Sequence, residues 1–358
     1  MKFRALKYTM IFTPLIFCGV AFLSNDWKVF SLLLYAFGFV PLLETLLRPQ
    51  HSNLEKTQLE IVKADRIYDF LLYLILPIQY AILIWFLIII DNPEATWWVT
   101  GGKILSMGLC CGILGINGAH ELGHRIQPYE KIMAKSLLLT SLYMHFFIEH
   151  NRGHHKRVST PEDPASARRG ETLFTFWVRS IIGSYLSAWK LENSRLHRKG
   201  RSPTSFQNEM VIYHLIQGTL MLAILFIFAW KTMCYFLLAA TIGYLVLETV
   251  NYIEHYGLQR KKLQNGQYEH VRPQHSWNSD HPIGRLLLFE LSRHSDHHYR
   301  PGRKYQTLRH IDTSPQMPTG YPGMMILALF PPIWFHIMHQ QILNFQATQA
   351  PLPPKPPA

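Results

Sequence analysis

The sequence predicts an all-α integral membrane protein with six transmembrane helices and a cytoplasmic helical cap that carries a histidine-rich dinuclear metal site. Of the 358 residues, 48% are hydrophobic and only 16% are charged, whereas an average soluble chain carries about 25% charge. The apolar residues gather in runs long enough to cross a bilayer. Histidines recur in short groups that follow the ends of these runs.

The first two apolar runs, 8–23 and 29–47, form a predicted helical hairpin. Basic residues before the first run make it resemble a signal peptide. It lacks a small-residue cleavage site, however, and the second run follows at once. We therefore expect an uncleaved first span.

The third and fourth spans are predicted at 67–90 and 99–119, and Pro77 should bend the third because proline has no backbone N–H. The polar loop 48–66 is basic and should be cytoplasmic, whereas the acidic stretch 91–94 should face outward. The fourth span leads directly into the first histidine motif, so this motif should lie at the cytoplasmic end of the bundle.

The apolar stretch 132–147 is short, and the segments on either side of it both belong in the cytoplasm. We therefore expect it to pack beneath or partly within the bundle without spanning it. The fifth and sixth spans are predicted at 211–230 and 232–250. Their ends should fray, because Lys231 alone cannot form a connecting loop.

These elements divide the chain into five regions. Four transmembrane helices and the first histidine motif occupy 1–124, and a cytoplasmic insertion with the second motif occupies 125–210. Helices five and six occupy 211–255, the cytoplasmic cap with the last motif occupies 256–345, and a disordered proline-rich tail occupies 346–358. With basic loops on one side, six spans place both termini in the cytoplasm.

Nine histidines lie in four motifs that this topology brings to the same side of the membrane. Neutral imidazole is the commonest metal ligand, and residues four apart share a helix face, as His150 and His154 do. His155 lies about 100° further round, where it can serve a second metal or the far side of the same one. Chance clustering explains one such group but not three, and nine imidazoles exceed what one metal can hold, so we predict two metals. The candidate ligands are His120, His124, His150, His154, His155, His255, His294, His297 and His298.

Acidic residues near these motifs are candidates to orient the histidine rings. Adjacent residues on a helix point in different directions, so each carboxylate should support a ligand from a neighbouring helix. A simple solvated acid is the alternative for any one of them. The candidates are Glu121, Glu149, Asp163, Glu254 and Asp296.

Charge and cysteine content argue against other classes of site. The net charge is +12, but the basic residues lie in the loops and no nucleic-acid-binding motif accompanies them, so nucleic acid is not an expected partner. The four cysteines lie in apolar runs without a Cys-x-x-Cys pair, which argues against an internal zinc, iron–sulfur or rubredoxin-type centre. We also expect no haem and no bound nucleotide.

Four stretches resemble the signatures of the integral-membrane alkane 1-monooxygenases, within the membrane fatty acid desaturase and hydroxylase superfamily. They are His-Glu-Leu-Gly-His at 120–124, Glu-His-Asn-Arg-Gly-His-His at 149–155, Asn-Tyr-Ile-Glu-His-Tyr-Gly at 251–257 and Arg-His-Ser-Asp-His-His at 293–298. The motif at 251–257 is the most specific, because the wider superfamily shares the histidine boxes but generally not this motif. The resemblance covers about residues 10–345.

The resemblance implies a non-haem di-iron enzyme of a bacterial inner membrane, with its active site on the cytoplasmic side. The nine histidines would hold two iron ions, and O2 would be the co-substrate. The enzyme would hydroxylate the terminal methyl of an n-alkane to a 1-alkanol, with electrons from a separate rubredoxin that an NADH-dependent reductase reduces. The composition of the site does not exclude zinc, which also binds imidazole.

Two further sets of residues follow from the resemblance. Relatives limit chain length with bulky residues on the second span, so Leu34, Ala36 and Phe37 are candidates to line the substrate tunnel. A small acidic electron donor would suit the basic cytoplasmic face. Its candidate contacts are Arg152, Lys156, Arg157, Arg300 and Arg303.

Two alternatives remain open from the sequence. A related membrane hydroxylase or desaturase could act on fatty acyl chains or aromatic hydrocarbons, although the motif at 251–257 favours an alkane monooxygenase. A membrane metal transporter would place its ligands near the bilayer midplane, often between inverted repeats. Here every motif lies at one face and no repeat is visible, which disfavours a transporter.

Overall fold

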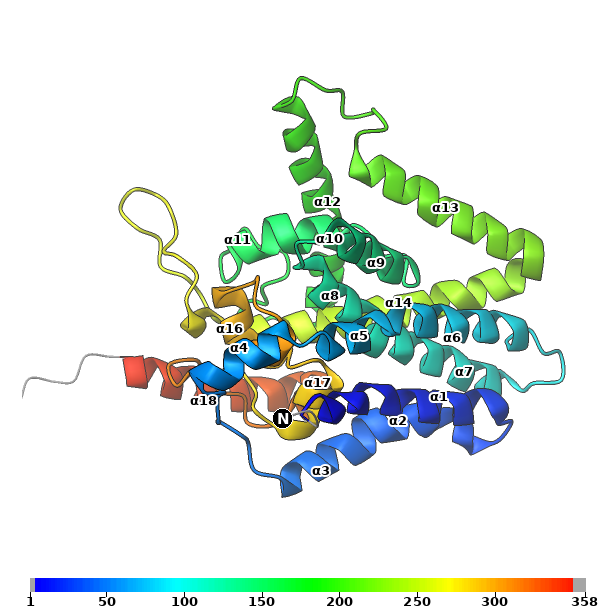
Figure 1. Cartoon of the computed structure of the whole chain (residues 1–358), viewed down its shortest axis with the longest axis horizontal. Helices are drawn as coiled ribbons and strands as arrows, with labels where there is room; N and C mark the ends of the chain where they lie inside the picture. The colour runs from blue at the N-terminus through cyan, green and yellow to red at the C-terminus, as the bar shows by residue number, and fades with distance from the viewer. Residues whose placement is uncertain (1–3, 350–358) are drawn as a thin grey trace, which may run out of the picture.

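The computed structural model describes residues 4–349, and in this part of the chain every regular element is a helix, apart from two isolated β-bridges (Figure 1). Six helical stretches are long and apolar enough to cross a membrane, which confirms the predicted number of spans. They are Ala5–Leu23, Trp27–Leu46, Ile67–Ile89, Trp97–Gly123, Glu209–Phe228 and Trp230–His255.

The first two spans form the predicted hairpin. Its turn is short, and the Asp26 carboxylate caps the second helix by accepting a hydrogen bond of 3.0 Å from the backbone N–H of Lys28. A π-helical turn, η3, lies in the middle of the second span and changes which side chains face inward. The elements are η1 (Ala5–Phe12), α1 (Thr13–Leu23), η2 (Trp27–Phe30), α2 (Ser31–Leu34), η3 (Tyr35–Phe39) and α3 (Val40–Leu46).

The third span is interrupted at Leu74, three residues before Pro77, which agrees with the predicted bend. Proline has no N–H to donate to the carbonyl of Tyr73, so the helix breaks there. The fourth span contains a second π-helical turn just before the first histidine motif. The elements are α4 (Lys56–Ala64) in the preceding loop, α5 (Ile67–Tyr73), α6 (Ile75–Ile89), α7 (Trp97–Cys110), η4 (Cys111–Ile116) and α8 (Asn117–Gly123).

The insertion between the fourth and fifth spans contains two helices of more than ten residues, α9 and α12. Helix α9 has only 12 residues and packs against α8, so it does not span the membrane, as expected. Helix α12 runs across the direction of the spans in Figure 1 and packs against the spanning helix α14. The elements are α9 (Pro128–Leu139), α10 (Phe146–Glu149), η5 (His150–His154), α11 (His155–Arg157) and α12 (Leu173–His197).

The last two spans, α13 (Glu209–Phe228) and α14 (Trp230–His255), meet at Ala229. The expected turn at Lys231 is therefore wrong, because Lys231 lies within α14. Ala229 adopts φ +104° and ψ 166°, and this single left-handed residue reverses the chain without frayed ends.

The cap closes the end of the bundle that carries the histidine motifs (Figure 1). It packs on the end of α14 through a core of buried aromatic residues that includes Tyr252, Trp277 and Trp334. Residues 346–349 of the expected tail belong to the last helix, and residues 350–358 lie outside the described part of the chain. The elements are η6 (Pro273–His275), α15 (Pro282–Leu287), α16 (His294–Tyr299), η7 (Tyr305–Thr307), α17 (Tyr321–Ala328) and α18 (Pro331–Gln349).

A buried carboxylate ties the second span to the cap. Glu44, near the end of α3, is 1% exposed and accepts a hydrogen bond of 2.7 Å from the backbone N–H of Gly284. The same carboxylate lies against Gly320, at the start of α17, where a Cβ would overlap it. The second span therefore holds two segments of the cap in place at once.

We expect Gly320→Ala to destabilise the protein by about 1–3 kcal/mol, because the added methyl must displace a buried carboxylate from its hydrogen bond. Thermal unfolding in detergent would measure the change. Gly302→Ala is the matched control, since no atom lies within 4 Å of the Cβ that it adds. Equal melting temperatures for the two variants would contradict the anchoring role of Glu44.

Candidate metal centre

The first histidine motif lies where the fourth span leaves the bundle. Helix α8 carries His120, and His124 follows at its C-terminus, so the two rings lie on one side of the helix as their spacing predicts. Their ring centroids are 5.1 Å apart. Nε2 of His120 is buried and has no hydrogen-bond partner, although it faces the other histidines.

The second motif does not follow the helical spacing expected from the sequence. Residues His150–His154 form the π-helical turn η5, in which backbone hydrogen bonds join residues five apart and the side chains are rotated from their α-helical positions. Nε2 of His150 therefore lies 3.0 Å from Nε2 of His155, whereas His154 points to a different group of rings. The rings of His150 and His154 still share a face, with centroids 5.3 Å apart, but the two residues belong to different groups of ring nitrogens.

The remaining four histidines come from the end of α14 and from α16. Nε2 of His255 lies 3.2 Å from Nε2 of His294, and Nε2 of His297 lies 3.2 Å from Nε2 of His155. His298 completes the set, with its Nε2 at 3.2 Å from that of His154. Three segments far apart in the sequence thus meet at one end of the bundle.

All nine predicted histidines converge, and they divide into two groups. Within each group the ring nitrogens lie within 4.8 Å of one another. The first group is His120, His124, His150, His155 and His297, and the second is His154, His255, His294 and His298. Two adjacent groups of this kind fit two metal ions, because each group brings four or five imidazole nitrogens close together.

The electrostatics favour neutral rings, which is the form that binds metal. Burial, followed by repulsion from His154, lowers the pKa of His124 to about 3. Burial also lowers the pKa values of His150 and His297 well below their ordinary value. For His154, burial alone would lower the pKa, but the Asp163 carboxylate outweighs this effect and raises it.

Two of the five predicted carboxylates contact a histidine of the set. Oδ2 of Asp163 lies 2.9 Å from Nδ1 of His154 and also accepts a hydrogen bond from Ser166, so it directs Nε2 of His154 toward the centre. Oε2 of Glu254 lies 3.1 Å from Nε2 of His294, the nitrogen that faces His255. Glu254 therefore reaches the centre itself and does not lie behind the ring.

The other three carboxylates do not support a ligand, and that expectation is corrected. Each faces an arginine: Glu121 pairs with Arg125 at 2.8 Å, Glu149 with Arg157 at 2.6 Å and Asp296 with Arg303 at 2.9 Å. A buried carboxylate is stabilised by an opposite charge, which an arginine supplies and a neutral imidazole does not. These ion pairs fasten the segments that carry the histidines.

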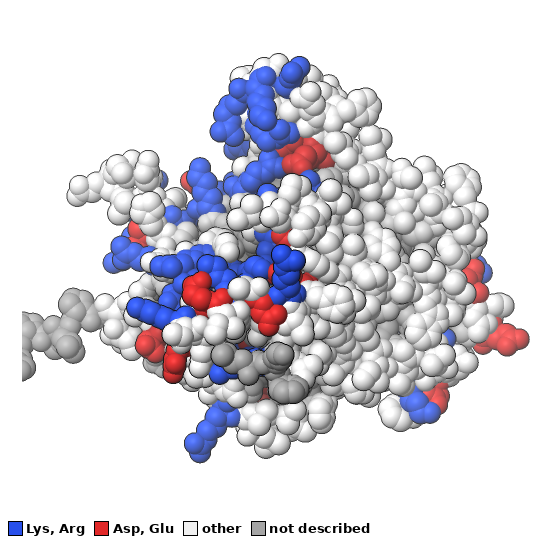
Figure 2. Space-filling view, in the orientation of Figure 1, with Lys and Arg blue, Asp and Glu red and all other residues white. Residues whose placement is uncertain are grey.

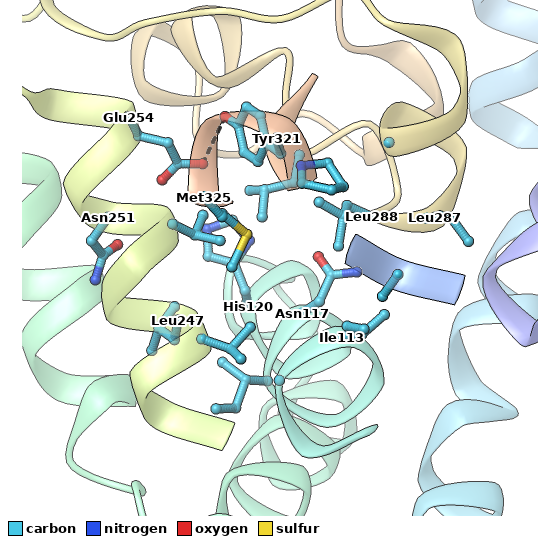
Figure 3. Close-up of a pocket in the computed structure, with 18 of the residues that line it drawn as sticks. Ile113, Asn117, His120, Leu247, Asn251, Glu254, Leu287, Leu288, Tyr321 and Met325 are labelled. Atoms are coloured by element: carbon cyan, nitrogen blue, oxygen red, sulfur yellow. Dashed lines mark hydrogen bonds between the residues drawn. The ribbon is translucent and has the colours of Figure 1, made fainter. Parts of the chain in front are cut away.

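An apolar cavity leads to the histidines from the middle of the membrane (Figure 3). It is a narrow cavity of about 70 Å³, and its walls come mainly from the second and fourth spans, α14, α15 and α17. His120, His150 and His294 line one end, so the cavity reaches both groups. Ile113 lies seven residues before His120 on the same spanning helix, which is about 10 Å at the helical rise.

The predicted tunnel residues divide between the two sides of the second span. Ala36 and Phe37 line the cavity, whereas Leu34 is 50% exposed on the outside of the bundle, so its assignment to the tunnel is wrong. Side chains two positions apart on a helix point about 200° away from each other, which places Leu34 and Ala36 on opposite faces. Sequence reasoning missed Asn117, whose buried side-chain N–H2 group has no partner and which lines the cavity one turn before His120.

Of the five basic residues proposed to contact an electron donor, only Lys156 and Arg300 are exposed. Arg157 and Arg303 are engaged in the ion pairs described above. Arg152 pairs with both Glu192 and Glu209, which joins the second histidine motif to α12 and α13. These three arginines therefore stabilise the fold around the histidines, and they offer little free charge to a partner.

Comparison with known proteins gives consistent matches. The model of the fatty acid desaturase family matches residues 95–339. Alkane 1-monooxygenase 1 of Alcanivorax borkumensis is 41% identical over 344 residues, which is 93% of this chain and 82% of that protein. Alkane 1-monooxygenase of Ectopseudomonas oleovorans is 40% identical over 93% of this chain and 83% of its own length. The xylene/toluene monooxygenase hydroxylase component of Pseudomonas putida is 30% identical over 66% of this chain and 63% of its own length.

Proposed function

The chain belongs to the fatty acid desaturase family and, within it, to the alkane 1-monooxygenases, and from this membership we propose that it hydroxylates the terminal methyl of n-alkanes. The observation that carries the proposal is the apolar cavity that joins the middle of the membrane to both histidine groups. An alkane dissolves in the bilayer and has no polar atoms, so a passage with apolar walls suits it. The relatives from Alcanivorax borkumensis, Ectopseudomonas oleovorans and Pseudomonas putida are named as alkane 1-monooxygenases.

The nine histidines would hold two iron ions, one in each group. Each group has the imidazole donors that a non-haem iron requires, and Glu254 adds a carboxylate at the edge of the second group. Iron bound there supplies the activation of O2. The overall reaction balances as R–CH3 + O2 + 2 electrons + 2 H+ giving R–CH2OH + H2O.

The protein's own residues position the substrate and protect the site. The cavity walls exclude water and hold an extended chain so that its end lies next to His120, His150 and His294. Asp163 fixes the orientation of His154. Tyr321 donates a hydrogen bond of 2.8 Å to Glu254, which fixes that carboxylate at the end of the cavity (Figure 3).

A separate rubredoxin would supply the electrons, since the cysteines of this chain lie in the spanning helices and form no metal-binding group among the described residues. Its docking face would be the end of the bundle that carries the histidines, where Lys156 and Arg300 are exposed. Figure 2 shows Lys and Arg gathered at this end, while the surface over the spans is almost uncharged. By the positive-inside rule this end would face the cytoplasm of a bacterial inner membrane, with residues 125–210 and the cap on that side.

The test is turnover of n-octane by the purified, detergent-solubilised protein with rubredoxin, its reductase and NADH. We expect close to two irons per chain and 1-octanol as the product. Octan-2-ol as the product would contradict terminal specificity. Oxidation of toluene or of a fatty acyl substrate, with no oxidation of octane, would assign the protein to a different substrate class. Octane oxidation with another reductant but not with rubredoxin would overturn the assignment of the donor alone.

A further inference from the structure

A third group of side chains of the types that ligate metals lies on the surface of the cap, apart from the nine histidines. His51 comes from the loop after the second span, Asp280 precedes α15, and His310 follows η7. A ring nitrogen of each histidine and an oxygen of Asp280 lie within 4.8 Å of one another. His310 and Asp280 are buried, whereas His51 is exposed, so the group is open to solvent on one side.

The spacing of the nitrogens matches that of two ligands on one metal. Nδ1 of His51 lies 3.3 Å from Nε2 of His310, and Oδ1 of Asp312 lies 3.0 Å from the same Nε2. Two ligand atoms each about 2.0–2.1 Å from a tetrahedral zinc ion are about 3.3 Å apart. The facing nitrogens of the nine-histidine centre lie at 3.0–3.2 Å, so the same structure shows this spacing where its metal ligands are expected.

A second carboxylate sets the direction of the His310 lone pair. Oδ2 of Asp280 lies 2.7 Å from Nδ1 of His310, and Oδ1 of Asp280 accepts a hydrogen bond of 3.0 Å from Arg293. With the proton of His310 on Nδ1, the lone pair of Nε2 points toward His51 and Asp312. A carboxylate behind a histidine in this way is the usual support of a metal-ligating imidazole.

A single hydrogen bond between His51 and His310 explains these contacts less well than a bound cation does. Without a cation, His310 must carry a proton on both ring nitrogens to satisfy Asp280 and Asp312, and Nδ1 of His51 at 3.3 Å then competes with Asp312 for the proton on Nε2. A cation between the three groups satisfies all of them. The Asp312 side chain is 98% exposed and can turn freely to complete the coordination.

The backbone around the group is held in place before any ion binds. The side-chain amide of Asn53 and the backbone of His310 exchange two hydrogen bonds, of 3.0 Å and 2.8 Å. The backbone N–H of Gln50 donates to the carbonyl of Asp280 at 2.9 Å. Arg293 also donates to the carbonyls of Gln50 and Ser52. Such support reduces the ordering needed when a metal binds.

We propose that His51, His310 and Asp312 form a third metal site that binds one zinc-type divalent cation, with Asp280 orienting His310. Two imidazoles and a carboxylate with room for a water suit Zn2+, whereas Mg2+ and Ca2+ prefer a shell of oxygens. A bound ion would join the loop after the second span to the cap, beside Arg293, which precedes His294. The site would therefore stabilise the cap over the nine histidines without taking part in oxidation.

The test titrates Zn2+ alone into the purified, iron-loaded, full-length protein and measures zinc and iron in the same sample after desalting. We expect one zinc per chain with unchanged iron, and an X-ray absorption edge that reports nitrogen and oxygen ligands. His51→Ala removes an exposed ligand with little risk to folding and should weaken zinc binding by at least tenfold. Zinc should raise the melting temperature of the wild type but not that of His51→Ala.

His197→Ala removes an exposed histidine from the end of α12 and is the matched control, expected to bind zinc like the wild type. Asp280→Asn should weaken binding by about 10- to 100-fold, as loss of an outer partner does at other sites. Unchanged zinc affinity in His51→Ala would overturn the proposal, and so would zinc uptake matched by an equal loss of iron. Because these readouts are metal content and melting temperature, they do not depend on the proposed reaction.

Discussion

Replacing His154 with alanine is expected to abolish alkane hydroxylation and to remove the metal from the group of four histidines. His154 is 1% exposed and is the one ligand candidate whose Nδ1 is held by a buried carboxylate, Asp163. Loss of such an outer partner alone costs about 10- to 100-fold in metal affinity or activity. Loss of the ligand itself should therefore exceed that range.

Iron content and product formation would be measured on the same purified sample. We expect iron to fall from two per chain toward one, because the first group keeps all five of its histidines. Asp163→Asn should give an intermediate loss. His145→Ala is the matched control, since His145 is also buried and lies in the same segment but belongs to neither group. Full iron and turnover in His154→Ala would refute the assignment of His154 as a ligand.

Hydropathy was sufficient to predict the six spanning helices, because a bilayer requires long apolar helices and leaves few alternatives. The bend at Pro77 also follows from a local rule, the missing N–H of proline. The turn between the last two spans does not. That turn depends on the positive φ of Ala229. Alanine rarely adopts a positive φ, and no sequence pattern indicates that it does so here.

The membership of the histidine set was predictable, but its division was not. Spacing rules assume 3.6 residues per turn, and the π-helical turn at 150–154 joins His150 to His155 where the rules join it to His154. The pair of Glu121 with Arg125 follows from i,i+4 helical spacing, whereas the pair of Asp296 with Arg303 depends on the turn that follows α16. The group at His51 and His310 escaped detection because its members are separated by 259 residues.

The second large effect concerns the length of the substrate. Replacing Ala36 with tryptophan is expected to shift the products toward shorter alkanes, because Ala36 lies halfway along the second span and lines the cavity. A tryptophan there fills space that the far end of a long chain would occupy. Since one methylene in a tight pocket changes specificity by about 10- to 200-fold, the rate for hexadecane relative to octane should fall by at least tenfold.

The second span supplies its own control for this prediction. Leu34→Trp adds a tryptophan two residues away on the opposite face, where Leu34 is 50% exposed outside the bundle. Competition between octane and hexadecane, with both alcohols measured by gas chromatography, would compare the two variants under one condition. We expect the product ratio to change in Ala36→Trp and to remain that of the wild type in Leu34→Trp. If both variants shifted the ratio equally, the effect would come from packing of the span, and the cavity beside Ala36 would not be the path of the alkane chain.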